Sequence, residues 1–257
     1  MQEHCSVIDL LLLSWQAEGM PPSTGLRARM RAELTAEIKE EARRQMAVEG
    51  APGLSLRAVT RSLGMASSAI YRYFPTRDDL LTALIVDAYD AIGAAAEKAD
   101  ADRPPDDFGG RWLAVGTAVR SWSLANPHQY ALLYGSPVPG YRAPEDTVDP
   151  AARIPLALLG PLRDGWRAGI VRAGAAHAEV DGPRTATLNR QLDELARTIA
   201  PGLPPGVIGA AISAWIHLFG MISFELFGHL VGSVDPADEF FEYEITAMAT
   251  SLGLPVG

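Results

Sequence analysis

One short segment of the chain combines side chains that suit contact with a nucleic-acid duplex. Ser67, Ser68 and Ala69 are short, so a backbone that carries them can come close to base edges. Arg72 can donate a pair of hydrogen bonds to guanine, and a tyrosine hydroxyl such as that of Tyr71 can bond to phosphate. The chemistry that these residue types support is binding.

The flanking sequence predicts a helix-turn-helix that would present this segment. Ser55 is a good N-cap, and apolar residues spaced three and four apart lead from it to Gly64, which can turn the chain with a positive φ. Ser67 or Ser68 is expected to cap a short helix that ends near Phe74. The second helix of such a unit enters the DNA major groove.

Helical patterns lie on both sides of this unit. The apolar spacing predicts a helix over residues 26–48, before the unit. After it, Thr76 is expected to cap a longer helix, with Asp78 and Asp79 favourably placed in the first turn. Residues 99–107, rich in aspartate and proline, are the expected domain boundary.

The second half of the chain also has a helical pattern, and no segment shows the alternation of a strand. Helices are predicted over residues 156–173, with a kink or break at Pro161, and over residues 185–199. Residues 207–230 are the most apolar segment, and a last helix is expected to begin at Asp235. The predicted fold class is all-α.

This organisation predicts two domains. Residues 23–98 would form an N-terminal three-helix, helix-turn-helix DNA-binding domain. Residues 106–252 would form a larger regulatory domain for effector binding and dimerisation. Residues 1–22 are an extension that no pattern assigns: they could add a helix, or Met20 could be the true start.

The charge distribution agrees with binding to DNA through one end. The net charge is −9, but residues 23–77 hold ten basic and five acidic side chains, whereas the rest hold 12 and 26. Screening over roughly 8 Å keeps the distant acidic part from cancelling a local attraction. A solvated basic face is the alternative interpretation. The single cysteine, Cys5, excludes an internal disulfide and favours a cytoplasmic location.

Residues 55–81 resemble the TetR family of bacterial transcriptional regulators. Thr60 departs from the family pattern, which usually has a small alanine there, so its hydroxyl is expected to bond a backbone carbonyl. Ala66 stands where a capping serine is usual. The matching residues are Gly64, the run Ala69-Ile70-Tyr71-Arg72-Tyr73-Phe74, Arg77 and Leu80-Leu81.

The resemblance implies which side chains face a double-stranded DNA operator. Arg77 matches a phosphate-contacting basic residue of the family, and it lies at a helix N-terminus that also attracts phosphate. Tyr71 and Tyr73 could instead help to close the small core. The candidate DNA-binding residues are Ser55, Thr60, Ser67, Ser68, Ala69, Tyr71, Arg72, Tyr73 and Arg77.

Residues 122–141 and 215–229 are similar to one class of TetR regulatory domains, which carries a Trp, His and Gly pattern in its late helices. The resemblance implies an effector cavity but names no ligand. The aromatic residues at 112, 122, 130, 134, 166 and 215 could line such a cavity or form plain core. The candidate ligand-binding residues are Trp112, Trp122, Tyr130, Tyr134, Trp166, His217, Phe219 and Glu225.

Two other interpretations of the late apolar segment are weaker. His217, Glu225 and His229 are spaced by eight and four, but no His-Glu-x-x-His signature accompanies them, so no metal is expected. A membrane span fits the length, but these polar residues and the lack of flanking lysine or arginine argue against it. A dimer-interface helix is preferred, with Gly220 and Gly228 allowing close approach.

The preferred function is a homodimeric, ligand-responsive transcriptional regulator, a repressor rather than an activator, that reads a palindromic operator. A small-molecule-binding protein whose helix-turn-helix is not used on DNA is the alternative. No glycine-rich phosphate loop, metal signature or nucleophile elbow points to an enzyme, and no cofactor is expected.

Overall fold

The computed structural model describes residues 23–172 and 185–256, and every regular element within these ranges is helical. This confirms the predicted all-α class. The expected N-terminal extension, residues 1–22, lies outside the described residues. The α-helices are α2 (Ser23–Glu49), α3 (Leu56–Ser62), α4 (Arg77–Ala101), α5 (Phe108–Ala125), α6 (Pro127–Tyr134), α7 (Val148–Arg167), α8 (Ala186–Ile199), α9 (Pro205–Leu226) and α10 (Asp238–Ser251).

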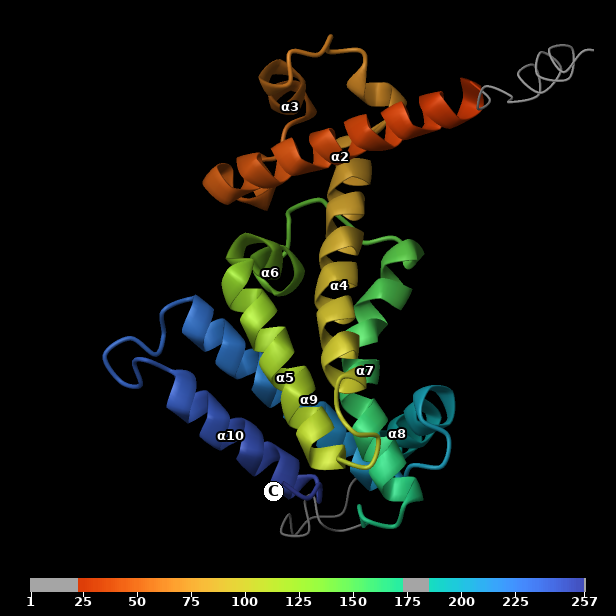
Figure 1. Cartoon of the computed structure of the whole chain (residues 1–257), viewed down its shortest axis with the longest axis vertical. Helices are drawn as coiled ribbons and strands as arrows, with labels where there is room; N and C mark the ends of the chain where they lie inside the picture. Colours follow the sequence, from red (N-terminus) through yellow and green to blue (C-terminus); the bar gives the residue numbers. More distant parts are fainter. Residues whose placement is uncertain (1–22, 173–184, 257) are drawn as a thin grey trace, which may run out of the picture.

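The helices form a small unit at one end of the molecule and a larger one below it (Figure 1). We call α2, α3 and the N-terminal half of α4 the head, and the remainder, to the end of α10, the body. In the head, α2 crosses the N-terminal end of α4 (Figure 1). It buries Ile38, Ala42 and Met46, spaced by four, in the head core. Gly50, with the positive φ of 72° that suits glycine, ends this helix.

Helix α4 runs from the head through the body and belongs to both cores. Thr76 caps it with a reciprocal capping box to Asp79, as the sequence predicts. Its first half buries leucines in the head core, whereas Ile92 and Ala96 belong to the body core. The core therefore divides inside this helix; residues 99–101 still belong to α4, and residues 102–107 connect α4 to α5.

Three of the helices predicted in the second half have different bounds. Helix α7 begins at Val148, because buried Ile154, Leu158 and Leu162 at spacing four favour one continuous helix despite Pro155 and Pro161. Helix α9 ends at Leu226, short of residue 230. Helix α10 begins at Asp238 rather than Asp235, so Asp238 and Glu239 occupy its favourable first turn.

Two arginines hold α4 against its neighbours. Arg153 of α7 packs across Gly93, where an added Cβ would lie 2.8 Å from the arginine Cβ, and donates to Asp90 and Glu97 at 2.6–2.8 Å. Hydrogen bonds from Arg153 lower the pKa of Glu97. This contact fixes the upper part of α7 on the middle of α4.

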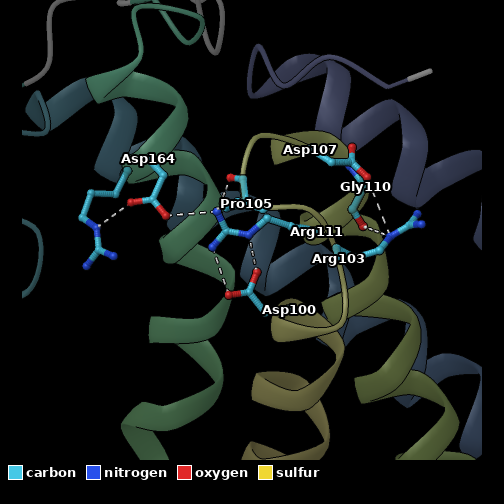
Figure 2. A network of polar contacts seen from close by, with 8 residues as sticks. Asp100, Arg103, Pro105, Asp107, Gly110, Arg111 and Asp164 are labelled. Atoms are coloured by element: carbon cyan, nitrogen blue, oxygen red, sulfur yellow. Dashed lines mark hydrogen bonds and ion pairs between the residues drawn. The ribbon is translucent and has the colours of Figure 1, made fainter.

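Arg111 of α5 makes the second clamp, at the far end of α4 (Figure 2). Its Nε and Nη2 donate to the two carboxylate oxygens of Asp100 at 2.7 and 3.0 Å. Its Nη1 donates to Asp164 of α7 at 3.0 Å and to the carbonyl of Pro105 at 3.1 Å. One largely buried guanidinium therefore joins three helices and the connection between α4 and α5.

The body also contacts the head directly, next to α6. The segment after α6 brings the Tyr141 hydroxyl within 2.9 Å of Thr82 Oγ1 on α4. Leu133 and Val138 pack against the head core, and Leu133 also packs against the body core. The loop of turn-forming residues around Pro139 is thus part of the junction that sets the orientation of the head.

Candidate nucleic-acid interface and interior cavity

The turn that leads into the candidate interface forms as the sequence predicts. Ser55 Oγ accepts a hydrogen bond from the Ala58 amide at 3.4 Å, which caps α3. Gly64 then turns the chain with φ 63°, a conformation that costs glycine little. These two features place the following segment on the outside of the head.

We call residues 66–74 the recognition segment. The prediction of an α-helix here is wrong, because the segment is a series of three-residue turns with a 3₁₀ turn at Ile70–Arg72. The amides of Ala69 and Arg72 donate to the carbonyls of Ala66 and Ala69 at 2.8 and 3.2 Å. Neither Ser67 nor Ser68 caps the 3₁₀ turn, which begins after Ala69. A segment this short gains little from α-helical bonds without a cap.

The orientation of the segment nevertheless agrees with the candidate site. Ile70 and Phe74, four residues apart, are buried in the head core. The side chains of Ser67, Ser68, Tyr71 and Arg72 are exposed, and those of Ala69 and Tyr73 are half-buried. The arrangement brings six of the nine candidate DNA-binding residues onto one short exposed segment.

Arg31 of α2 supports the recognition segment and was missed by the sequence reasoning. Its Nη2 donates to the carbonyl of Arg72 at 3.0 Å. Its guanidinium also lies over the ring of Tyr73, 5.2 Å from the ring centroid. The two partners lie about forty residues further along the chain, so no local pattern could have identified this contact.

Thr60 is a correction to the candidate set. Its side chain is buried, and its hydroxyl donates to the Arg57 carbonyl at 3.0 Å, so it cannot reach DNA. The expected bond to a backbone carbonyl is confirmed. The residue lies on the inner face of α3 because its methyl group packs in the small core.

Arg77 holds backbone carbonyls in the structure, and the phosphate contact expected of it stays a prediction. Its Nε donates to the Leu54 carbonyl at 2.9 Å, and its Nη2 donates to the carbonyls of Ala51 and Pro52 at 2.9 and 3.1 Å. The guanidinium thereby satisfies carbonyls in the turn between α2 and α3. Sequence alone could not separate these roles, because both need a cation at the start of α4.

Two further arginines belong to the same surface. Arg57 and Arg61, four residues apart on α3, are exposed, and like Arg72 they have no ion pair among residues 23–172 and 185–256. The signal that could have found them is their spacing on the outer face of a helix whose inner face is apolar. By contrast, Lys39 and Arg43 of α2 are neutralised by Asp87 of α4 at 2.8 and 2.7 Å.

The body contains a small pocket of about 50 Å³, partly open to solvent, between α5, α7, α8 and α9. Of the eight candidate ligand-binding residues, it brings Trp112 alone to the cavity wall. Trp215, which belongs to the aromatic group singled out by the sequence, also lines it. The other walls are aliphatic, and such residues carry no sequence signal that separates a cavity from plain core.

Three of the remaining candidates form a separate aromatic cluster. Tyr130, Tyr134 and Phe219 stack with centroids 4.4–6.3 Å apart. The Tyr130 hydroxyl donates to the Phe219 carbonyl at 3.2 Å and lies 2.8 Å from Ser223 Oγ. Burial raises the pKa of Tyr130 and of Tyr134. Trp122 and Trp166 are half-buried and pack against the same body core.

The two ionisable candidates have partners outside the cavity. Glu225 accepts hydrogen bonds from Arg120 Nε at 2.7 Å and Nη2 at 2.5 Å, which joins α9 to α5. His217 lies half-exposed, with its Nε2 3.6 Å from a carboxylate oxygen of Glu244 on α10. Neither residue lines this pocket, and each contacts a side chain of a neighbouring helix; a role for them in ligand binding stays a prediction.

Helix α9 passes the length and apolarity test for a membrane span, and no other helix of the described ranges does. Ala214, Leu218 and Ile222 on this helix are buried in the body core. Packing against the body therefore accounts for the apolarity on that side, as in the core helix of a folded domain.

Comparison with known proteins places both halves in one family. A family model described as bacterial regulatory proteins of the tetR family matches residues 38–84. A second, described as a tetracyclin repressor-like C-terminal domain, matches residues 112–248. The first match covers the head core and the recognition segment, and the second covers most of the body.

Individual relatives of this chain agree with the family models. The HTH-type transcriptional regulator Rv1816 of Mycobacterium tuberculosis is 38% identical over 204 residues, which cover 79% of this chain and 85% of that protein. The solved structure of the regulatory protein SCO4313 superimposes with a TM-score of 0.69 at 32% identity, covering 86% of this chain and 97% of that one. A tetR-family regulatory protein from Rhodococcus RHA1, at 16% identity and a TM-score of 0.59 over 86% of this chain and 98% of that one, shares the fold. This chain belongs to the TetR family of helix-turn-helix transcriptional regulators.

Proposed function

We propose that the protein is a homodimeric, cytoplasmic repressor that binds a palindromic operator and releases it when a small molecule occupies the body. The observation that carries this proposal is the exposed recognition segment together with three arginines, Arg57, Arg61 and Arg72, that form no ion pair with any residue the structure describes. Cations that no carboxylate neutralises are available to phosphates and bases.

The roles of the three arginines differ in this proposal. Arg72 lies on the recognition segment itself and would donate to a guanine in the major groove. Arg57 and Arg61 lie on α3 and would neutralise phosphates at the groove edge. Ser67, Ser68 and Ala69 would let the backbone approach the bases, while Arg31 holds the segment and Arg77 holds the turn between α2 and α3.

The exposed apolar surface formed by α9, α10 and the segment between them supports a dimer. Ile216, Phe224, Phe227, Val231 and Tyr243 are between 47% and 73% exposed in the single chain. Apolar side chains of this size on one face of a molecule mark an interaction surface. A two-fold pairing through this face would place two heads on half-sites about one helical turn, or ~34–36 Å, apart.

Salt-dependent binding to an operator, selected from random DNA, tests the DNA part of the proposal. Arg57→Gln and Arg61→Gln should each reduce the slope of log affinity against log salt by about 0.9, because each would remove one phosphate contact. Arg72→Gln should weaken binding by about 1–3 kcal/mol and relax preference at one base position. Arg190→Gln, an exposed arginine on α8, is the matched control.

A flat salt response of the wild-type protein, or equal effects of Arg72→Gln and Arg190→Gln, would contradict DNA recognition by this segment. That outcome would favour a small-molecule-binding protein whose helix-turn-helix is not used. For the dimer, Phe224→Glu should shift the sedimentation of the protein to that of a monomer, whereas Leu26→Glu on the exposed part of α2 should not. Unchanged sedimentation of Phe224→Glu would contradict this face as the interface.

A further inference from the structure

One face of helix α2 continues past the end of the head core. Ile38 on this face is fully buried in the head core, and Leu34, one turn earlier, is half-buried against it. Arg31 and Arg27 follow toward the start of the helix at spacings of three and four, so all four side chains lie on the same face of α2. The inner face of α2 therefore changes from apolar to basic where the core ends.

Arg31 shows what the basic part of this face lies against. Its Nη2 donates to the Arg72 carbonyl at 3.0 Å, and its guanidinium lies 5.2 Å from the centroid of the Tyr73 ring. Arg27 is four residues closer to the start of the helix, or about 6 Å further along its axis. Arg27 therefore lies next to the recognition segment, at the rim of the head.

The Arg27 side chain is exposed and makes no hydrogen bond or ion pair with residues 23–172 or 185–256. Residues 25–33 are all exposed, so the first turns of α2 lie outside the packed part of the head. A guanidinium is always charged and matches the geometry of a phosphate. With no carboxylate of the described residues beside it, the charge of Arg27 is available to a nucleic-acid backbone.

The recognition segment has exposed arginines on two sides. Figure 1 shows α3 above the part of α2 that is nearer its C-terminal end, whereas the N-terminal end of α2 projects beyond the head on the other side. Helix α3 contributes Arg57 and Arg61, which are exposed. The start of α2 contributes Arg27, which the contact between Arg31 and Arg72 places beside the same segment.

From this arrangement we propose that Arg27 binds a backbone phosphate of the operator, on the strand opposite to the one that Arg57 and Arg61 contact. The inference rests on the proposed function and adds a second DNA-contacting helix to it. The major groove of B-DNA is about 12 Å wide, so a segment at its middle has a phosphate backbone about 6 Å away on each side. One turn of α2 together with the length of an arginine side chain covers this distance.

A phosphate contact suits this position better than a base contact. Arg27 lies at the rim of the head, outside the segment whose short side chains let the backbone approach the bases. Phosphate contacts fix the orientation of a protein on the duplex and carry no sequence information directly. Contacts to both strands would restrain rotation of the head about the recognition segment. Arg27 should therefore raise affinity and salt dependence without changing which bases are preferred.

Three variants of the full chain test the proposal on an operator selected from random DNA. Arg27→Gln should weaken binding about three- to tenfold and reduce the slope of log affinity against log salt by about 0.9. Arg27→Lys should keep the slope, because it keeps the charge. The matched control is Arg29→Gln, at an exposed position of the same helix end but on the opposite side of α2, which should change neither quantity. Base preference should stay the same in all three.

Operators with single phosphates replaced by neutral methylphosphonates locate each contact. The wild-type protein should lose affinity for replacements in two groups, which lie on opposite strands across the major groove. Arg27→Gln should become insensitive to one group and Arg57→Gln to the other. Circular dichroism and thermal unfolding establish that each variant is folded, so the loss of response reports the contact itself.

The proposal is overturned if Arg27→Gln binds the operator as Arg29→Gln does, or if Arg27→Gln and Arg57→Gln become insensitive to the same group of phosphates. It is also overturned if Arg27→Gln changes base preference and leaves the salt slope unchanged, since that result would make Arg27 a residue that positions the recognition segment. Failure of the proposed function gives a different result, because the wild-type protein would then show no salt-dependent binding to the operator.

Discussion

The head and the body are both built from helices, but different contacts stabilise them. The head core has 12 buried hydrophobic residues and the body core has 28. With so small a core, the head holds its shape through side chains that bond to backbone, as in Arg77, Arg31 and the Thr76 capping box. The body instead relies on packing and on arginines that join helices. Most candidate DNA-binding residues of the head are exposed, whereas most candidate ligand-binding residues of the body are buried or half-buried.

The largest expected effect comes from removing one buried leucine in each region. Leu81→Ala in the head and Leu162→Ala in the body should each lower the free energy of unfolding by about 2–5 kcal/mol, because both side chains are fully buried. Leu81→Ala should also abolish operator binding, whereas Leu162→Ala should mainly affect the response to ligand. Chemical denaturation and DNA titration measure both. Equal loss of DNA binding in the two variants would contradict the separation of roles between head and body.

The second-largest loss of stability is expected from removal of the Arg111 side chain. Arg111→Met leaves Asp100 and Asp164 without their partner and should cost about 2–3 kcal/mol, somewhat less than for a fully buried pair because the carboxylates are partly exposed. Arg103→Met is the control, since its pair with Asp107 is long, 3.8 Å, and solvated. Thermal unfolding measures both, and similar melting temperatures for the two variants would show that the clamp does not stabilise the body.

Arg77 and Arg72 test whether positioning and recognition are separate within the head. Arg77→Met should lower the free energy of unfolding by about 1–2 kcal/mol, because three backbone carbonyls lose their donor. Arg72→Met should leave stability within about 0.5 kcal/mol of wild type, since the side chain is exposed. Both should weaken operator binding. A destabilised Arg72→Met protein would contradict the assignment of these two roles.

A smaller effect is expected for the buried tyrosine of the body. Tyr130→Phe keeps the ring in the aromatic cluster but removes the hydroxyl that contacts Ser223 and the Phe219 carbonyl, which should cost about 1 kcal/mol. Tyr71→Phe, at an exposed position of the recognition segment, should leave stability unchanged. Denaturant midpoints compare them, and an unchanged midpoint for Tyr130→Phe would mean that this polar contact is neutral.

The smallest effect is a pH dependence at the contact between α4 and α7. Arg153 lowers the pKa of Glu97 below its ordinary value of 4.5, so the folded state gains stability above that value. The gain is lost as the pH falls from 4.5 through the lower pKa of the folded state. Arg153→Met should make the free energy of unfolding fall less steeply as the pH is lowered from 6 to 3. The effect is small because Glu97 is exposed and Arg153 is partly exposed. The same acid dependence in the variant and the wild type would mean that other carboxylates cause it.

Much of the head could be predicted because its signals are local. Ser55, Gly64 and Thr76 act within a few residues of themselves, and each forms the cap or turn that its chemistry predicts. The α-helix predicted for the recognition segment did not form, because short segments depend on caps and on neighbours. Arg31 is such a neighbour, and it lies on a different helix.

The candidate ligand site was much less predictable. Trp112 and Trp215 line the cavity, but Tyr130, Trp122 and Trp166 have the same residue types and lie elsewhere in the core. Aromatic residues fill cores and cavities for the same reason, their large apolar area. The difference depends on whether a neighbouring helix fills the space beside the ring, and sequence spacing does not report that.

Local chemistry in the chain by itself determined the helices, their caps, the glycine turn and the uneven charge of the two regions, because each depends on residues a few positions apart. Packing between helices decided the rest: that α4 is shared by two cores, that Arg77 holds a turn, that Glu225 joins Arg120, and that the Trp215 N–H is left without a partner in a cavity wall. Those outcomes depend on which side chains meet across distances of tens of residues, and only the folded chain brings them together.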